Sequence, residues 1–518
     1  MALKNFFSKP IVLLLFSACL SALPLTFSDL YLISWVSFVP FFYVIVSKKC
    51  DKFLRAVGRG FLFGFVFHVC VYYWFLWFYP IDYVNLNSAE SIAVVCLAWL
   101  GISVVHGFLW CIPFVCCHFV SRITKNSLFI ALVAVLGCIA AQKATALGEL
   151  SFPWARVSLG QYKATALIQS AWIWGIDGVD MLILLVNALL VLALLYKSKR
   201  RLVAVIMVAV LFFGNLGFGI IKINQSASGD TINILTAQAS VPTDEKWASN
   251  GDKICLDAYT TLTQDNVTDD VDLILWPESA VPKIYKNARA LKDYKKFSKK
   301  LDTPILAGII LNTADGNTNN AILIDEDGVQ TVYTKRKMVP FGEFMPYKNV
   351  LSNLFPMLTE LNIIEDDYIA GNSSAIMSVG NNKKIGSVIC FESIYPDLTR
   401  QSTLDGAEML VELTNDSWLK DSPAMSQHLA HGVFRSVETG RYLVRSANSG
   451  ISAVIDNHGN IKSTIDINEQ GVIVEEIELF DEQTLYTKTG DILFPLFASS
   501  MLIWLIFIII KKIKTADS

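Results

Sequence analysis

The sequence alternates between long uncharged apolar runs and one long polar stretch, and this pattern constrains the fold more than any other feature. Crossing the ~30 Å hydrocarbon core of a bilayer takes about 17 to 25 apolar residues in a helix. Eight runs reach or approach that length. They cover about 10–28, 30–47, 60–80, 91–120, 127–142, 166–196, 202–223 and 492–510. The sequence therefore predicts a polytopic α-helical membrane domain of eight transmembrane helices, interrupted by one large insert.

The composition agrees with a membrane protein. The 518 residues are 53% hydrophobic and only 17% charged, which is too apolar for an ordinary soluble enzyme. The formal net charge of −3 gives no electrostatic reason to expect a nucleic-acid partner.

Positive charges cluster after every second run, and this spacing predicts the topology. The cations that follow the second, fourth, sixth and eighth runs are Lys48, Lys49, Lys52, Arg55, Arg59, Arg122, Lys125, Lys197, Lys199, Arg200, Arg201, Lys511, Lys512 and Lys514. The other connections are acidic or have few cations. Because cytoplasmic loops carry the excess of lysine and arginine, both termini are expected in the cytoplasm and the insert outside it.

Three regions follow from this topology. Residues 1–223 form a membrane domain of seven helices, residues 224–491 form the exported insert, and residues 492–518 supply the eighth helix and a cytoplasmic tail. Residues 1–24 have a basic start and a short apolar run, so a cleaved signal peptide is the alternative for the first helix.

The insert alternates short β-rich runs with helical patterns. Strands are expected at 232–238, 271–276, 304–311, 320–325, 329–335, 384–390, 408–415, 442–448 and 452–461, with helices near 244–263, 288–300 and 425–439. Asp327-Gly328 marks a hairpin between two of these strands. Continuous apolar strands are typical of sheets covered on both faces, so the insert is expected to be a layered α/β domain.

Cysteine usage raises a question about the insert. Of ten cysteines, only Cys255 and Cys390 belong to it, which rules out a disulfide framework. The two residues can pair with each other or serve as small buried apolar residues. Alternatively, Cys390 in "KIGSVICFESIYPD" ends an apolar run at a position suited to a reactive group.

Three polar residues stand where expected strands end: Glu278, Lys335 and Cys390. Catalytic groups favour such positions, because a rigid sheet fixes them while the loop leaves them reachable. Single surface charges usually have no role, but Pro277 and the prolines around Glu343 restrict the backbone more than an ordinary loop requires.

The chemistry that this trio suits is acyl transfer. A thiol with a pKa of about 8.5 is only slightly ionised near neutrality, so a neighbouring carboxylate that removes its proton helps it to attack. Attack on a carbonyl builds an oxyanion, which an ammonium group stabilises in a dry pocket. The insert's two histidines in one expected helix, His428 and His431, lack a partner motif, and neither a metal nor a triad role is predicted for them.

The insert resembles the nitrilase superfamily, whose members use a glutamate, a lysine and a cysteine in this chain order. Nearly the whole chain is similar to the apolipoprotein N-acyltransferase family of bacterial inner-membrane enzymes. The motifs that carry the resemblance are "LTAQASVPTDEKW", "WPES", "YTKRKMVPFGEFMP", "CFES", "LTNDSW", "QH" and "RSVETGRYLVRSANSGIS". The lysine motif is the most specific of them.

The resemblance implies a fold, a site and a reaction. The insert would be a periplasmic α-β-β-α sandwich, with Glu278 as general base, Lys335 as oxyanion-stabilising cation and Cys390 as nucleophile. Glu343 and Glu392 match further acidic positions of the family site. Trp247 matches a tryptophan on a loop near the substrate.

The implied reaction moves an acyl chain from a phospholipid to the diacylglyceryl-cysteine of an apolipoprotein through a cysteine thioester, in the inner membrane of a Gram-negative bacterium. No cofactor, metal or nucleic acid takes part. The alternatives are a membrane-tethered amidase or nitrilase, which would use water as acceptor, and a transporter whose exported domain is a binding module.

Several further positions have structural interpretations. Phe391 stands where the family often has tyrosine, and Tyr442 replaces a common proline. A set of polar and aromatic residues near the site is expected to support the fold through turns, packing and buried pairing. This set is Asn415, Asp416, Trp418, Arg441 and Arg445.

The aromatic stretch 63–79 is expected to face lipid and form an interfacial belt, with an acyl-chain groove as the alternative. Asp177 and Asp180 are expected at the membrane edge or in the bundle interior.

Overall fold

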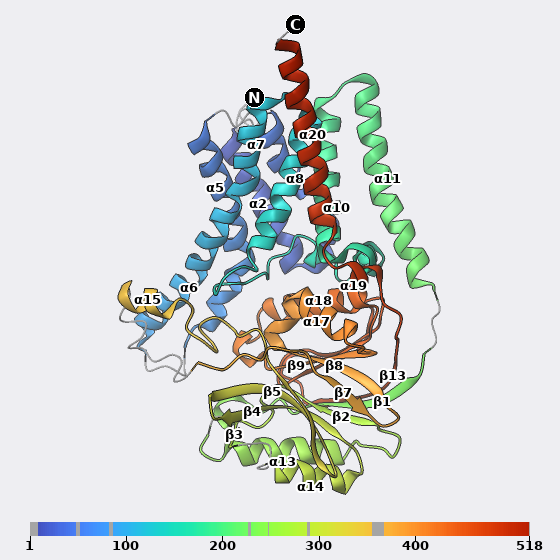
Figure 1. Ribbon diagram of the computed structural model, residues 1–518. Helices are drawn as coiled ribbons and strands as arrows, with labels where there is room; N and C mark the ends of the chain where they lie inside the picture. The colour runs from blue at the N-terminus through green and yellow to red at the C-terminus, as the bar shows by residue number, and fades with distance from the viewer. Residues whose placement is uncertain are drawn as a thin grey trace.

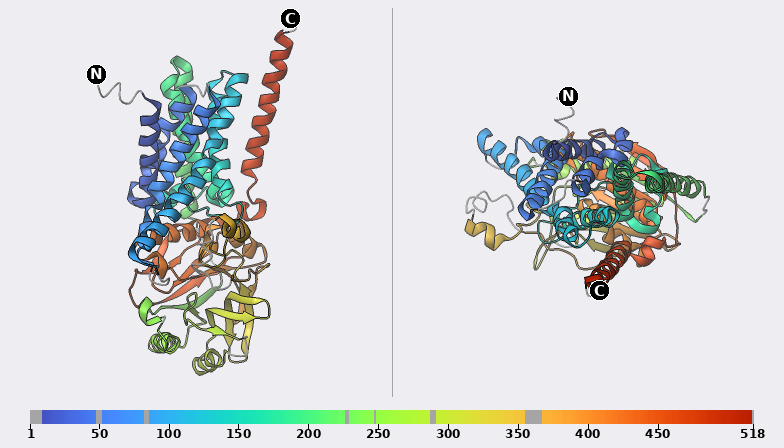
Figure 2. Two further views of the ribbon diagram at one scale, coloured as in Figure 1. Left: turned by 90° about the vertical axis from the view of Figure 1, so that its left-hand side faces the viewer. Right: turned by 90° about the horizontal axis from the view of Figure 1, so that it is seen from above.

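The structure is a computed structural model that describes residues 9–47, 52–81, 86–225, 229–246, 248–286, 291–354 and 367–516. A bundle of long helices stands on a layered domain of sheets and helices (Figure 1). Both ends of the described chain lie at the far end of the bundle, away from the sheets (Figures 1 and 2). The predicted fold class, a polytopic helical membrane domain joined to an α/β domain, is confirmed.

The bundle is built from the apolar runs. Its main helices and 3-10 turns are α2 (Pro10–Thr26), η1 (Ser28–Ile33), α3 (Ser34–Ser37), α4 (Val39–Ser47), α5 (Phe53–Val71), η2 (Tyr72–Phe78), α6 (Ser88–Leu109), α7 (Cys111–Ile123), α8 (Ser127–Ala144), α10 (Ala171–Leu195), α11 (Ser198–Ile223) and α20 (Leu493–Ala516).

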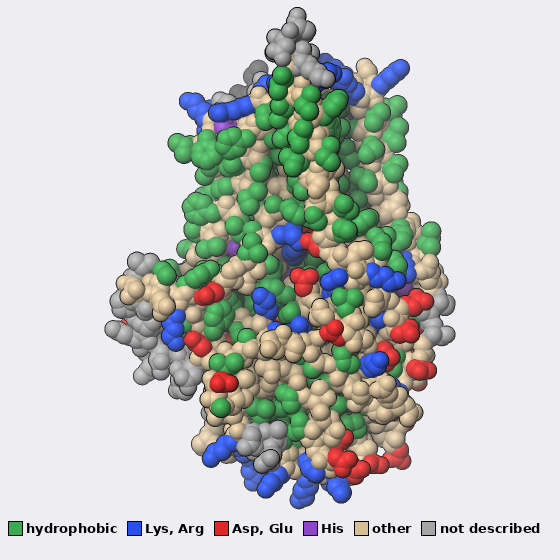
Figure 3. Space-filling view, viewed as in Figure 1, with side chains coloured by type: hydrophobic (Ala, Val, Ile, Leu, Met, Phe, Trp, Pro, Cys, Tyr) green, Lys and Arg blue, Asp and Glu red, His purple; other side chains and the backbone are tan. Residues whose placement is uncertain are grey.

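Seven helical segments among the described residues are long and apolar enough to cross a membrane. They are Ser28–Ser47, Phe53–Phe78, Ser88–Ile123, Ser127–Ala144, Ala171–Leu195, Ser198–Ile223 and Leu493–Ile513. The helix Pro10–Thr26 is apolar but has 17 residues, so the expected number of eight spans stays a prediction. Hydrophobic side chains cover the bundle, whereas acidic side chains gather over the other half of the molecule (Figure 3).

The middle of the connection between α8 and α10 is buried and joins the two halves of the molecule. Residues 151–162 are all buried, and this segment includes η3 (Leu159–Gln161). Within it, Arg156 forms ion pairs with Asp177 and Asp180 of α10, and its Nε donates to Asp180 Oδ2 at 2.8 Å. The two aspartates thus face the interior, as one of the two sequence interpretations expected.

The other half contains two sheets that face each other. The first has the order β13-β1-β2-β4-β5-β6, with β3 paired to β4, and the second has the order β12-β11-β10-β9-β8-β7. The strands of the first sheet are β1 (Thr231–Gln238), β2 (Leu273–Trp276), β3 (Ile284–Tyr285), β4 (Ile305–Thr313), β5 (Gly316–Asp325), β6 (Gly328–Thr334) and β13 (Gly471–Glu478). Those of the second sheet are β7 (Ile376–Val379), β8 (Lys383–Ile389), β9 (Met409–Thr414), β10 (Leu443–Ala447), β11 (Ser452–Ile455) and β12 (Ile461–Ile465).

Helices cover the outer face of each sheet, which gives four layers (Figure 1). Helices α13 (Gly251–Gln264) and α14 (Lys292–Leu301) pack on the first sheet. Helices α17 (Pro396–Leu404) and α18 (Ala424–Thr439) pack on the second sheet, and α18 lies against α10 of the membrane bundle. One apolar core fills the space between the sheets, where Leu275 and Leu323 of the first meet Val411 and Val444 of the second. The predicted α-β-β-α sandwich is confirmed.

Shorter elements complete the layered domain. They are α12 (Thr243–Lys246), α15 (Lys348–Leu354), η5 (Cys390–Ile394), η6 (Ser417–Leu419) and α19 (Leu485–Thr489). The bundle also has a short helix α9 (Thr165–Ile168). The run 452–461, expected as one strand, is instead the hairpin of β11 and β12, because Asp456 accepts hydrogen bonds from the turn amides of His458 and Asn460.

The aromatic stretch 63–79 does not form the expected lipid-facing belt at four of its positions. Phe63, Phe67, Tyr72 and Trp74 have no exposed surface. The cause is the position of α5 and η2, which pack against α2, α6 and α7 and turn these side chains into the bundle. The lipid-facing interpretation is therefore wrong for these residues.

Candidate active site

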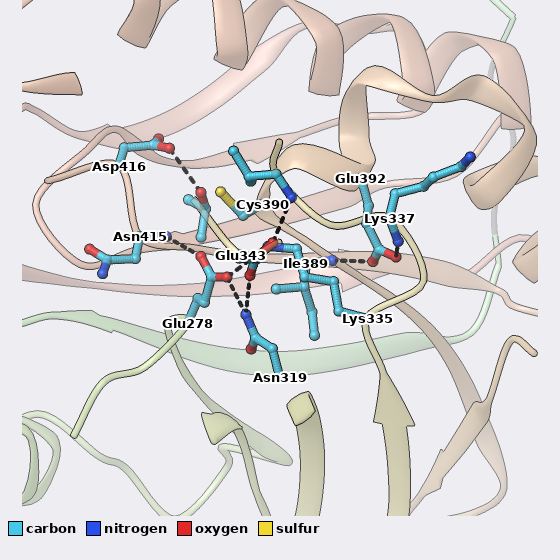
Figure 4. A network of polar contacts seen from close by, with 12 residues as sticks. Glu278, Asn319, Lys335, Lys337, Glu343, Ile389, Cys390, Glu392, Asn415 and Asp416 are labelled. Atoms are coloured by element: carbon cyan, nitrogen blue, oxygen red, sulfur yellow. Dashed lines mark hydrogen bonds and ion pairs between the residues drawn. The ribbon is translucent and has the colours of Figure 1, made fainter. Parts of the chain in front are cut away.

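Three strand ends place Glu278, Lys335 and Cys390 in the space between the two sheets. Glu278 follows β2, Lys335 follows β6 and Cys390 follows β8 directly. Their exposed fractions are 6%, 1% and 3%. Figure 4 shows Cys390 next to the polar contacts that Glu278 and Lys335 make. The three strand ends therefore lie close together in space, and the catalytic roles of the three residues stay a prediction.

Lys335 lies between two carboxylates. Its Nζ is 3.1 Å from Glu278 Oε1 and 2.9 Å from Glu343 Oε1. Burial alone would lower the pKa of Lys335, but the two carboxylates outweigh it and hold that pKa well above its usual range. Lys335 is therefore a fixed ammonium ion at the bottom of the site.

Backbone and amide donors orient the two carboxylates. Asn319 of β5 donates from Nδ2 to Glu278 Oε1 at 2.7 Å and to Glu343 Oε1 at 3.0 Å. The remaining oxygen of Glu278 accepts from the amide of Asn415 at 2.9 Å, and that of Glu343 accepts from the amide of Val339 at 2.8 Å. Neither carboxylate can rotate away from Lys335 without losing these bonds.

Cys390 begins the 3-10 turn η5 with a φ of 51°, in the left-handed region that residues with a Cβ rarely adopt. Burial raises the pKa of its thiol well above the usual range, and the charge of Glu278 raises it further, whereas Lys335 opposes the shift. The thiol is therefore protonated near neutral pH, and a base must take its proton before it can attack.

Glu392 is buried and its carboxylate is fully occupied, which gives it a holding role. Its Oε2 accepts from Tyr333 OH at 2.7 Å and from the Ile389 amide at 2.8 Å. Its Oε1 accepts from the amides of Arg336 at 2.6 Å and Lys337 at 3.2 Å. Burial raises the pKa of Glu392, and these hydrogen bonds oppose the shift. Glu392 thus ties the segment after Lys335 to the turn of Cys390 (Figure 4).

Residues 63–79 and the buried connection form an aromatic wall next to this turn. The ring of Phe391 stacks on Phe152 with 5.8 Å between centroids, and Phe152 also contacts Tyr72 and Trp74. The turn of Cys390 therefore lies directly against the membrane bundle.

The structure also settles three smaller expectations. Cys255 and Cys390 are both free thiols, so the disulfide alternative is wrong. Arg445 forms buried ion pairs with Glu412 and Asp416, as expected of a supporting arginine. Arg441 donates to backbone carbonyls, with 2.8 Å from its Nε to Ala407 O. Trp247 lies outside the described residues.

Sequence reasoning missed Asn319. It lies in the polar run "NTNN" at the start of β5, where nothing in the local pattern separates it from its neighbours. Its role follows from the antiparallel pairing of β5 with β4 and β6, which carries its amide to the carboxylates of two distant loops. Such a role is visible only once the sheet is assembled.

Two family patterns match this chain. The pattern of the carbon-nitrogen hydrolase family matches residues 246–485, and that of the apolipoprotein N-acyltransferase N-terminal domain matches residues 17–189. The first covers the converging residues and every strand of the two sheets except β1, and the second covers most of the bundle.

Curated relatives match most of the chain. An apolipoprotein N-acyltransferase from Geobacter metallireducens is 27% identical over 89% of this chain and 88% of its own length. One from Thermotoga maritima is 26% identical over 93% of this chain and 89% of its own. Among solved structures, a CN-hydrolase superfamily protein from Xanthomonas campestris is 16% identical, with a TM-score of 0.38, over 52% of this chain and 97% of its own.

Proposed function

Because the chain belongs to the apolipoprotein N-acyltransferase family, we propose that it transfers an acyl chain from a phospholipid to the α-amino group of the N-terminal diacylglyceryl-cysteine of apolipoproteins. The observation that carries the proposal is the position of Cys390. Its turn lies beside a buried glutamate–lysine pair on one side and against the membrane bundle on the other. A lipid-derived ester held at the bundle surface is therefore within reach of the thiol.

The first half of the reaction loads the enzyme. Glu278 takes the proton of the Cys390 thiol, and the sulfur attacks the ester carbonyl of the phospholipid. The negative charge that develops on the carbonyl oxygen faces the ammonium of Lys335, which the flanking carboxylates keep protonated. The C–O bond breaks, the proton passes from Glu278 to the leaving oxygen, and a thioester and a lysophospholipid result.

The second half transfers the acyl chain. The α-amine of the diacylglyceryl-cysteine attacks the thioester as a neutral amine, and Glu278 accepts the proton that the nitrogen loses. The C–S bond breaks, an amide forms and Cys390 recovers its proton. Both substrates are lipids, which accounts for the union of this catalytic domain with a membrane bundle.

Three more residues support this site. Glu343 holds Lys335 together with Glu278. Glu392 fixes the turn of Cys390. We assign Trp247 to a loop that contacts the lipid substrates, on the strength of its place in the motif "DEKW".

The same proposal covers the location of the chain. We place it in the inner membrane of a Gram-negative bacterium, with both termini in the cytoplasm and the catalytic domain in the periplasm. Lysine and arginine side chains gather at the bundle end that lies opposite the sheets, which supports this orientation (Figure 3). The domains then run over 1–223 for the membrane helices, 224–491 for the periplasmic catalytic domain and 492–518 for the last helix and tail.

Mass spectrometry of the purified protein tests the proposal. Incubation with phospholipid should add one acyl mass to the peptide that contains Cys390 and release a lysophospholipid. When a diacylglyceryl lipopeptide is added afterwards, the Cys390 peptide should lose the acyl mass and the lipopeptide should gain it. A Cys390→Ser variant should show neither event.

The result also separates the alternative activities. A membrane-tethered amidase or nitrilase would pass the acyl group to water and would turn over small amides without lipid. A transporter would take up no acyl mass. A Cys390→Ser protein that N-acylates lipopeptides at the parent rate would contradict the proposal.

A further inference from the structure

A second buried polar cluster lies behind Cys390, on the side away from Lys335. Its members come from β9, the loop after β9, β10 and α18, and each is at most 1% exposed. They are Glu412, Asp416, His428 and Arg445. Arg445 forms ion pairs with both carboxylates, and the hydroxyl of Thr414 donates to Asp416 Oδ1 at 2.9 Å.

His428 connects this cluster to the backbone of the nucleophile. Its Nε2 is 3.2 Å from the carbonyl oxygen of Cys390 and 3.0 Å from Ser393 Oγ. Because a carbonyl oxygen only accepts hydrogen bonds, a bond between these two atoms requires a hydrogen on Nε2. The ring is also fixed on its other side, where Nδ1 is 3.0 Å from Asp416 Oδ1.

Two charged groups also lie close to the ring. Arg445 Nη2 lies 3.0 Å from Nδ1, and Glu412 Oε1 lies 3.4 Å from Nε2. Nδ1 donates to Asp416 when it carries a hydrogen and accepts from Arg445 when it does not. A hydrogen on Nε2 faces the carbonyl oxygen of Cys390, both in the charged ring and in the neutral tautomer that carries its hydrogen there. In the other neutral tautomer, Nε2 accepts from the hydroxyl of Ser393 instead.

The backbone of Cys390 needs such a restraint. A left-handed conformation at a residue with a Cβ is disfavoured and persists only where the surroundings hold it. Glu392 holds the amide of Ile389, on the N-terminal side of Cys390. His428 holds the carbonyl on the C-terminal side. Together the two contacts fix the turn that directs the sulfur toward Glu278.

A metal site is a weaker interpretation of the same residues. One ligand atom each from Cys390, Asp416 and His428 lies within 4.8 Å of the others. However, Asp416 and His428 already bind each other, Arg445 and Thr414, and the Arg445 guanidinium lies where it would repel a metal cation. The side chains are committed to holding the turn.

We propose that His428 is a positioning residue for acyl transfer: its Nε2–H holds the carbonyl oxygen of Cys390 and thereby fixes the left-handed turn that presents the thiol to Glu278 and Lys335. The proposal rests on the proposed function in one respect, that Cys390 is the nucleophile.

Two substitutions at the same position separate the two ring contacts. In His428→Gln, the amide nitrogen reaches the place of Nε2 and keeps a donor toward Cys390. In His428→Asn, the shorter amide keeps a donor toward Asp416 and loses the one toward Cys390. A positioning role therefore predicts that Cys390 reacts more slowly in His428→Asn than in His428→Gln. A purely structural role predicts a similar loss of Cys390 reactivity in both variants.

The readout is the rate at which iodoacetamide alkylates Cys390 in the purified full-length protein without lipid, followed on the Cys390 peptide by mass spectrometry. One lost hydrogen bond of ordinary strength corresponds to roughly tenfold. We expect His428→Asn to slow alkylation about tenfold or more, and His428→Gln to stay within about threefold of the parent. The kcat of acyl transfer should follow the same order with KM little changed.

His431 supplies the matched control. It lies one turn further along α18, is equally buried, and its Nε2 faces Trp154 O at 3.2 Å instead of Cys390. His431→Asn and His431→Gln should leave Cys390 alkylation within about twofold of the parent, since neither touches the turn. Melting temperatures verify that all four proteins are folded, and His428→Ser replaces His428→Asn if that variant does not fold.

Two results would overturn the proposal: equal alkylation rates for His428→Gln and His428→Asn, or a loss in His431→Asn as large as that in His428→Asn. Failure of the proposed function is a separate event. It appears as a parent protein that takes up no acyl mass from phospholipid, whatever the alkylation rates are.

Discussion

Cys390 lies between two buried networks. In both, a cation stands between two carboxylates, but the two networks differ in their exposure to solvent. In the front network Lys335 stands between Glu278 and Glu343, and in the back network Arg445 stands between Glu412 and Asp416. The front carboxylate side chains keep 8% and 13% of their surface, whereas those at the back keep none. A partly exposed carboxylate can exchange a proton with a bound substrate. A fully buried ion pair can only stabilise the fold. The difference in access therefore separates chemistry from support.

The largest expected effect comes from Glu278→Gln in the front network. The amide keeps the size and the contact with the Asn415 amide but cannot accept a proton from the thiol or the incoming amine. Loss of a general base costs about 10²–10⁴ in rate. We expect acyl transfer to fall by that factor, measured as acyl mass on the Cys390 peptide over time. The melting temperature should also fall, because the amide nitrogen faces the donors Asn319 and Lys335.

The same variant has a second effect of opposite sign. Because the charge of Glu278 raises the pKa of the Cys390 thiol, its removal lowers that pKa. The pH profile of Cys390 alkylation should therefore shift to lower pH in Glu278→Gln, whereas Lys335→Met should shift it to higher pH. A Glu278→Gln profile that moves to higher pH would contradict the electrostatic account of the front network.

The next effect should come from Arg445→Met in the back network, and it should appear in stability. Removing this guanidinium leaves Glu412 and Asp416 buried without a partner cation, which costs about 3–5 kcal/mol. Burial alone would raise the pKa of Asp416, but Arg445 and His428 hold that pKa well below its usual range, so the carboxylate depends on them. Thermal denaturation compares Arg445→Met with Lys335→Met. We expect the larger drop in melting temperature for Arg445→Met, because the front carboxylates retain some contact with water after Lys335 is removed.

The sequence predicts the front network well and the back network only in outline. Glu278, Lys335 and Cys390 each follow an apolar run that reads as a strand, and each lies in a specific motif. The partner of Arg445 is not visible in this way. It follows from the parallel pairing of β10 with β9, which sets Arg445 opposite Glu412. Register between strands that lie 33 residues apart is a tertiary property.

The same limit applies to the fold. The sequence predicts most strands of the sandwich, because continuous apolar runs mark them. It missed β13, whose residues alternate between exposed and buried and whose partner β1 lies more than 200 residues earlier. It also missed β7, a four-residue edge strand after a long loop. Short or half-buried edge strands are specified mainly by their neighbours.

A smaller effect is expected from Glu392→Gln, which weakens the link between the segment after Lys335 and the turn of Cys390. The carboxylate accepts four hydrogen bonds, and an amide nitrogen in place of one oxygen leaves buried donors facing each other. Unsatisfied buried groups cost about 1–3 kcal/mol, which corresponds to roughly 10–100-fold in acyl transfer if the turn of Cys390 shifts. Tyr333→Phe is the control.

Tyr333→Phe removes one of the four donors and leaves the carboxylate in place. It should therefore cost less than Glu392→Gln in the same acyl-transfer assay. Equal losses in the two variants would mean that the Tyr333 hydroxyl, and not the carboxylate, fixes the turn.

The smallest effect should come from Phe391→Tyr. In the described part of the chain, the contacts of this ring are with other aromatic rings and not with the charged groups of either network. The ring is held by stacking on Phe152 and by an edge contact with Tyr395, and tyrosine keeps both. We expect acyl transfer within about threefold of the parent, since aromatic contacts of this kind are worth only about 0.5–1.5 kcal/mol even when lost entirely. Phe391→Leu, which removes the stacking, should cost more. If Phe391→Tyr instead changes the rate tenfold or more while the melting temperature holds, the ring contributes to the site itself, and the division into a reactive front and a supporting back would have to include the aromatic wall as a third element.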